Sequence, residues 1–156
     1  GRYLWFPPLV YDLGSVAFGH LSSVRARRNR YDGSPDRALV AVAAALTACI
    51  GLLAFTRDPR TATVIAAVAM AGGAGLYALL TSDLMSRVPA GAVSTAGGLC
   101  AAAQSIAHIV FNPIIGAFAQ RDGDYHRAVL LLAVWVIPGT LAWLLWVPPP
   151  AREDAV

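Results

Sequence analysis

The polar side chains inside the long apolar stretches of this sequence are the residues most able to bind a ligand. Gln104, His108 and Asn112 recur at intervals of four in the charge-free run 88–120, so on a helix they share one face. Their amide and imidazole groups donate and accept hydrogen bonds, so we predict that this face lines a substrate cavity. The competing interpretation is that the same groups hydrogen-bond to neighbouring helices. Aliphatic residues occupy the opposite face: Leu99, Ile106 and Val110.

A second candidate face lies in the run 61–82. Tyr77 and Thr81 are four residues apart and share a helix face with Met70 and Gly73. The Tyr77 ring can stack on a sugar, and its hydroxyl can donate to a carboxylate. Equally, Tyr77 can be an aromatic residue of a helix core. The nearby glycines are expected to permit close helix approach instead of binding a ligand: Gly72, Gly73 and Gly75.

Asp12 is the one acidic residue within the apolar run 3–24, and it falls near the middle of that run. It shares a helix face with Ser15, Gly19 and Ser22. A carboxylate at this depth indicates either a proton-coupling group in an aqueous cavity or a group that is hydrogen-bonded to a neighbouring helix. Both interpretations stay open at the level of the sequence.

The sequence offers no set of residues for enzymatic chemistry. It has no nucleophile beside a base, no paired catalytic carboxylates and no phosphate-binding glycine loop. Cys49 and Cys100 are isolated within apolar runs, and the histidines lack ligand spacing. We therefore expect no enzyme activity, no metal site and no cofactor.

Composition and charge spacing predict the elements that position these residues. Hydrophobic residues form 57% of the 156-residue chain, and charged residues form only 13%. Since a membrane-spanning helix needs about 20 mostly apolar residues, each long uncharged run is a candidate span. We predict an all-α transmembrane fold, with residues 1–156 forming a single membrane domain. The five expected spans are 3–24, 38–56, 61–82, 93–119 and 128–147.

All 12 basic residues are arginines, and they gather in the links between apolar runs. The largest group lies in the loop 25–37. This group consists of Arg25, Arg27, Arg28 and Arg30, and the loop also contains Arg37. Because arginine-rich loops stay in the cytoplasm, we predict that this loop and the C-terminus are cytoplasmic. Attraction to anionic lipid headgroups also explains the arginines, and no nucleic-acid partner is expected.

Several segments resemble the second half of major facilitator superfamily transporters, closest to the anion:cation symporter family of hexuronate and galactonate carriers. The matching segments are Trp5-Phe6-Pro7, Asp12-Leu13-Gly14-Ser15, Thr81-Ser82-Asp83-Leu84 with Arg87, and Gly97-Gly98 through Gln104-Ser105 to Asn112-Pro113. In order, they resemble helices eight, ten and eleven of that family. The resemblance covers nearly the whole chain as helices eight to twelve.

This resemblance implies a partial six-helix half of an alternating-access carrier that moves small organic anions, such as sugar acids, together with protons. It implies a bacterial inner membrane and a partner half, earlier in the same polypeptide, that supplies the anion-binding arginine. The start of the chain at Gly1 fits that expectation. Cys100 and Ala101 replace an asparagine of some relatives, and Tyr77 replaces a tryptophan. The alternative is a five-span scaffold or interaction protein without transport.

Overall fold

The computed structural model describes residues 5–29, 36–123 and 125–145, and these residues contain helices and no strand. The elements are α1 (Phe6–Asn29), α2 (Arg37–Ala48) continued by the 3-10 helix η1 (Cys49–Phe55), α3 (Pro59–Arg87), the short η2 (Ala90–Ala92), α4 (Val93–Asp122) and α5 (His126–Leu145). Four helical stretches are long and apolar enough to cross a membrane: Arg37–Phe55, Pro59–Arg87, Ala90–Arg121 and His126–Leu145. The prediction of an all-helical chain with membrane-length helices is therefore confirmed.

The expected first span, 3–24, is not among these four stretches. Its helix, α1, forms, but Asp12 and several serines and glycines lower its hydropathy, and its last turns carry Arg25 and Arg27. Pro7 and Pro8 do not break the helix. They fall in its first turn, where a missing N–H leaves no intrahelical hydrogen bond unmade.

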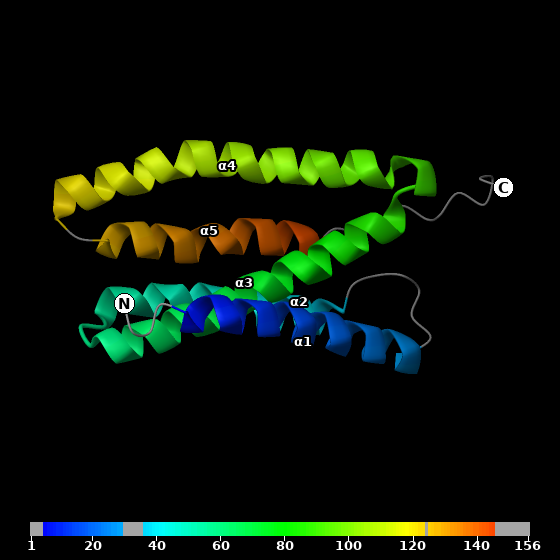
Figure 1. Ribbon diagram of the computed structural model, residues 1–156, viewed down its shortest axis with the longest axis horizontal. Helices are drawn as coiled ribbons and strands as arrows, with labels where there is room; N and C mark the ends of the chain where they lie inside the picture. The colour runs from blue at the N-terminus through cyan, green and yellow to red at the C-terminus, as the bar shows by residue number, and fades with distance from the viewer. Residues whose placement is uncertain (1–4, 30–35, 124, 146–156) are drawn as a thin grey trace.

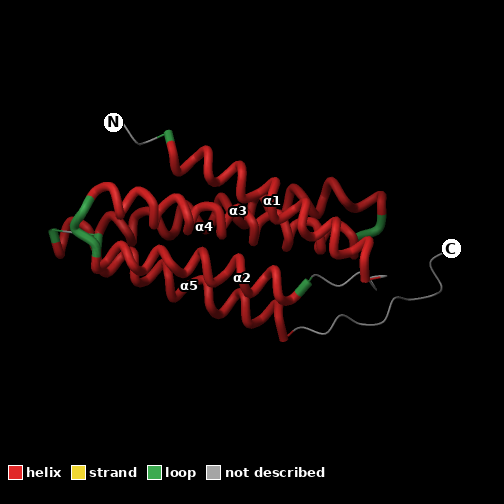
Figure 2. Tube along the Cα trace, turned by 90° about the horizontal axis from the view of Figure 1, so that it is seen from below, coloured by secondary structure: helices red, strands yellow, loops and turns green. Residues whose placement is uncertain are grey.

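Helix α3 lies at the centre of the described bundle, with α1 on one side and α2 on the other (Figures 1 and 2). Glycines bring the three helices close together. A Cβ on Gly72 would lie 2.7 Å from the Ala43 carbonyl oxygen of α2, and a Cβ on Gly75 would strike the Phe18 ring of α1. The predicted role of the glycine cluster is confirmed at these two positions. Gly73 differs, because a Cβ there would meet nothing within 4 Å.

The core is small and lies where these three helices meet. It is formed by the buried side chains of Phe18, Leu39, Val40, Ala43 and Leu79. Helix α5 adds Leu144 to the edge of this core and packs along α2 and η1. Most other large apolar side chains are exposed, as expected for helices whose outer surfaces face lipid.

The predicted span 61–82 ends before residues 83–87, but this segment forms the last turns of α3. Asp83 and Arg87 are four residues apart on the helix and make a two-point ion pair, with N–O distances of 2.7 and 2.8 Å. The pairing satisfies both charges locally, so the helix continues although Asp83 is buried. The link to α4 is correspondingly short and comprises residues 88–92.

Helix α4 stands apart from the central three helices. Figure 1 shows it on the side of α3 that lies away from α1 and α2, with α5 between. It contacts α5 through the Phe111 and Trp135 rings, whose centroids are 4.8 Å apart. The helix continues through Pro113 and ends at Gly123, which has a left-handed φ of 72°. All ten residues of the stretch 101–110 are exposed.

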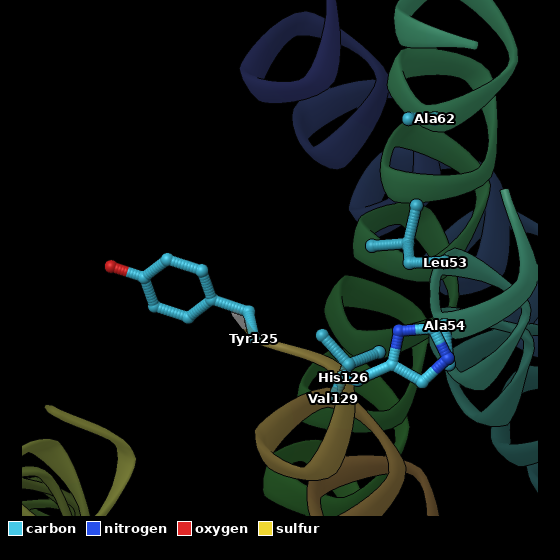
Figure 3. Close-up of a pocket in the computed structure, with 6 residues that line it drawn as sticks. All are labelled: Leu53, Ala54, Ala62, Tyr125, His126 and Val129. Atoms are coloured by element: carbon cyan, nitrogen blue, oxygen red, sulfur yellow. The ribbon is translucent and has the colours of Figure 1, made fainter. Parts of the chain in front are cut away.

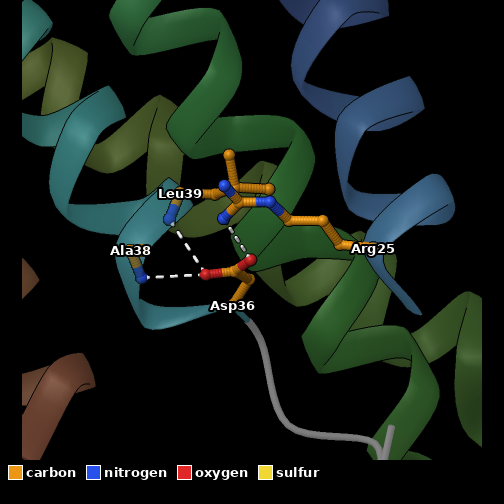
Figure 4. Close-up of polar contacts among 4 residues, drawn as sticks. All are labelled: Arg25, Asp36, Ala38 and Leu39. Atoms are coloured by element: carbon orange, nitrogen blue, oxygen red, sulfur yellow. Dashed lines mark hydrogen bonds and ion pairs between the residues drawn. The ribbon is translucent and has the colours of Figure 1, made fainter. Parts of the chain in front are cut away.

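Asp36 fixes the start of α2 and joins it to α1 (Figure 4). One carboxylate oxygen accepts from the backbone N–H groups of Ala38 and Leu39, at 3.0 and 3.3 Å. The other accepts from the Arg25 guanidinium at 2.6 Å. Partial burial raises the pKa of Asp36, but the Arg25 hydrogen bond, the backbone hydrogen bonds and the Arg25 charge hold it below its ordinary value of 3.8.

The two roles of Asp36 are separable by substitution. Asp36→Asn keeps an oxygen for the helix cap and removes the ion pair, so we expect a loss below about 1 kcal/mol in the free energy of unfolding. Asp36→Ala removes both and should cost about 1–2 kcal/mol. Because the pKa is lower in the folded state, the stability from Asp36 is present at neutral pH and is lost as the pH falls below about 4. Detergent unfolding of the three proteins at pH 7 and pH 3 checks this; an unchanged Asp36→Ala deficit at pH 3 contradicts it.

Candidate functional site

The polar face of α4 lies on the same side of the helix as its contact with α5, although its side chains are exposed. Gln104 and His108 precede Phe111 by seven and three residues, so all three share one face of the helix. Phe111 packs on Trp135 of α5, and this contact orients that face inward. On the opposite face, Leu99 and Ile106 are 68% and 61% exposed, as suits lipid contact. Asn112 follows Phe111 directly and flanks the inward face.

The candidate residues of α3 lie on the side of that helix that neither α1 nor α2 covers. Gly72 faces α2 and Gly75 faces α1. At 100° per residue, Tyr77 is about 140° around the helix from Gly72 and about 160° from Gly75. Tyr77 is accordingly 54% exposed. Thr81, one turn later, is half-buried. Figure 1 shows α4 on the side of α3 that lies away from α1 and α2.

The two candidate faces do not touch each other. Tyr77 and Thr81 of α3 make no hydrogen bond or ion pair with the α4 side chains within the described part of the chain. The neighbouring α4 surface is exposed throughout 101–110. Within the described residues, the two polar faces are therefore separate and exposed.

Asp12 lies on a third uncovered face. The contact of α1 with α3 uses Gly14 and Phe18, which sequence periodicity alone did not single out. Asp12 is about 160° around the helix from Gly14 and is exposed. Its carboxylate has no hydrogen bond or ion pair with any described residue. Gly19, on the same face as Asp12, would meet nothing within 4 Å if it carried a Cβ.

The arginine group is only partly described. Arg25 pairs with Asp36, and Arg27 is exposed at the end of α1. Arg30 and the side chain of Arg28 lie outside the described residues. The Arg25 guanidinium is thus paired with Asp36, the residue that caps α2, while the Arg27 side chain is exposed.

Two of the hollows among the described residues lie elsewhere and are apolar. One, of about 260 Å³, lies where η1, α3 and α5 meet at one end of the bundle (Figure 3). Its lining is Leu53, Ala54, Ala62, Tyr125, His126 and Val129. His126 also makes an edge contact with Phe55, at a centroid distance of 6.1 Å. A second hollow of about 240 Å³ runs between α2 and α5. Neither contains a residue predicted from the sequence to bind substrate.

No group of three His, Cys, Asp or Glu side chains within the described residues is arranged to hold a metal ion. Cys49 and Cys100 are both free thiols. Comparison of the chain with protein-family models, curated proteins and solved structures gave no match.

Proposed function

We propose that this chain is part of a secondary active transporter in which the open face of α3 and the inward face of α4 line the substrate path. The observation that supports the proposal is that Gln104 and His108 lie on the same side of α4 as Phe111, which contacts α5, while Leu99 and Ile106 lie on the opposite side. Polar side chains at membrane depth are costly against lipid, so they favour a water-filled path or another protein surface. The resemblance to major facilitator carriers supports the first of these.

The proposed substrate is a small organic anion such as a sugar acid, carried together with a proton. Tyr77, Thr81, Gln104 and Asn112 are uncharged hydrogen-bonding groups that suit a hydroxyl-rich ligand. They do not neutralise a carboxylate, so a positive group in a first half of the carrier would have to do so. Asp12 is the candidate for proton coupling. In this proposal the protein lies in the bacterial inner membrane, with the arginine loop and the C-terminus in the cytoplasm.

Gln104→Ala tests the proposed path, with Leu99→Ala as its matched control on the lipid side of the same helix. Loss of the amide should leave a ligand hydroxyl without its partner, so we expect roughly tenfold weaker binding of a sugar acid such as galactonate. Leu99→Ala should leave binding within about twofold of the unchanged protein. Binding is measured by calorimetry on the complete carrier in detergent, with expression as a check on folding.

Two outcomes would count against the proposal. If Gln104→Ala lowers expression while the remaining protein binds normally, the amide is a packing group between helices. If no sugar acid binds the unchanged carrier but cations or lipophilic compounds do, the substrate class is wrong.

A further inference from the structure

The hollow between α2 and α5, here called the α2–α5 groove, has a volume of about 240 Å³ and an apolar lining. Its α2 wall consists of four alanines: Ala41, Ala44, Ala45 and Ala48. Its α5 wall consists of aliphatic side chains and Thr140. The Thr140 hydroxyl donates to the Val136 carbonyl oxygen at 2.8 Å, so the polar group of that wall already has an acceptor. Hydrocarbon is therefore the filling that this groove accepts at least cost.

The length of the groove matches one leaflet of a bilayer. Both walls belong to stretches that are long and apolar enough to cross a membrane, Arg37–Phe55 and His126–Leu145. At 1.5 Å per residue, Ala48 lies roughly 16 Å along the helix from Arg37. Half of the hydrocarbon core of a bilayer is about 15 Å thick. With α2 across a bilayer and Arg37 at its surface, the groove runs from just below that surface to the midplane.

Arg37 lies at the surface end of the groove. It is the first residue of α2, one turn before Ala41. At 100° per residue, Arg37, Ala41 and Ala48 fall within about 40° of one another around the helix. Arg37 is exposed, and no ion pair or side-chain hydrogen bond joins it to another described residue. A cation in the first turn opposes the helix dipole, so α2 gains no stability from Arg37, and its guanidinium is available to bind a phosphate.

We propose that an anionic phospholipid binds here, with one acyl chain in the α2–α5 groove and its phosphate on Arg37. The apolar lining suits the chain, the length suits one leaflet, and the charge of Arg37 suits the phosphate. The loop 25–37 is expected on the cytoplasmic side, where the leaflet carries anionic lipids. This inference concerns the membrane-embedded chain and holds whether or not it transports a substrate.

A second copy of the chain is disfavoured as the occupant of the groove. A two-fold axis along the membrane normal would place identical grooves face to face. The two Arg37 guanidinium groups would then meet at the same depth and repel each other. A helix is also about 10 Å across, so it would bridge the hollow instead of filling it.

Photolabelling of the full polypeptide in phosphatidylcholine vesicles tests the proposal. Two probes carry the same diazirine-bearing acyl chain, one on phosphatidylglycerol and one on phosphatidylcholine, and the labelled peptides are mapped by mass spectrometry. We expect phosphatidylglycerol to label residues 41–48 and 136–144 about fivefold more than phosphatidylcholine does, the preference that one cation near a membrane surface supports. The two probes should label Leu99, Ile106 and Val110 equally.

Two arginine variants separate binding at the groove from general attraction of anionic lipid. Arg37→Gln should lower the fivefold preference to less than about twofold. Arg27→Gln removes an exposed arginine at the same end of the bundle, where Arg25 of α1 pairs with Asp36, and should leave the preference at the groove unchanged. Equal labelling by the two probes in the unchanged protein, or equal effects of the two variants, would overturn the proposal.

A second pair of variants tests whether the chain occupies the hollow itself. Ala45→Phe fills the groove and should lower labelling of residues 136–144 by both probes at least fivefold, or roughly the loss of contact with one or two methylene groups. Ala103→Phe, at an exposed position on α4, should change that labelling less than about twofold. Unchanged labelling in Ala45→Phe, or groove segments that neither probe labels because protein covers them, would also overturn the proposal.

Discussion

Gly72→Ala is expected to destabilise the protein by about 3 kcal/mol, although it adds one methyl group. A Cβ at this position would lie 2.5 Å from the Thr47 nitrogen and 2.7 Å from the Ala43 carbonyl oxygen. Both are backbone atoms of α2, so no side chain can move aside, and α2 and α3 must separate. Their contact forms much of the small core, in which Val40 and Ala43 are fully buried. Unfolding in mixed detergent, followed by tryptophan fluorescence, measures the loss.

The adjacent glycine provides the control for this prediction. Gly73 is in the same helix, but a Cβ there meets nothing within 4 Å. Gly73→Ala should therefore leave stability unchanged or raise it by up to about 1 kcal/mol, since alanine is the better helix former. Equal effects of the two substitutions would show that α2 and α3 do not pack as described.

Arg87→Ala is expected to cost roughly 2–3 kcal/mol in unfolding free energy. The Asp83 side chain is only 3% exposed, so removal of Arg87 leaves a buried carboxylate without its ion-pair partner. The expected cost lies at the lower side of the range for broken buried pairs, because the Arg87 side chain is 21% exposed and water can partly replace it. Arg60→Ala, at an exposed position in the first turn of the same helix, should cost less than about 0.5 kcal/mol.

A double variant separates the ion pair from simple loss of the arginine stem. If the unpaired charge is the cause, Asp83→Asn in the Arg87→Ala background should recover about 1 kcal/mol or more. Should the double variant be as unstable as Arg87→Ala, the cost comes from lost packing of the arginine side chain.

The helical class and the approximate spans were predictable because uncharged runs of about 20 residues have few alternatives to a membrane helix. The ends of the helices were less predictable. Charges at 83–87 suggested a solvated link, but pairing of Asp83 with Arg87 keeps them inside α3. The roles of Gly72 and Gly73 could not be told apart either, because they depend on where α1 and α2 sit around α3.

The candidate site shows the same division between local and tertiary information. Periodicity placed Gln104, His108 and Asn112 on one face, and Phe111, which contacts Trp135, lies on the same side of the helix as Gln104 and His108. Periodicity could not show that this face stands apart from Tyr77, because helix separation is set by the packing of α4 on α5. The open faces of α1, α3 and α4 therefore became visible only in three dimensions.

Thiol labelling along α4 tests the proposed substrate path most directly. Single cysteines at Gln104, His108 and Asn112, and at Leu99, Ile106 and Val110, are exposed in native membranes to a water-soluble, membrane-impermeant maleimide after Cys49 and Cys100 are replaced by alanine. We predict that the first three positions react and that galactonate slows their reaction, while the second three stay unlabelled. Labelling of neither set, or labelling of Gln104, His108 and Asn112 that no sugar acid slows, would contradict the assignment of this face to a transport path.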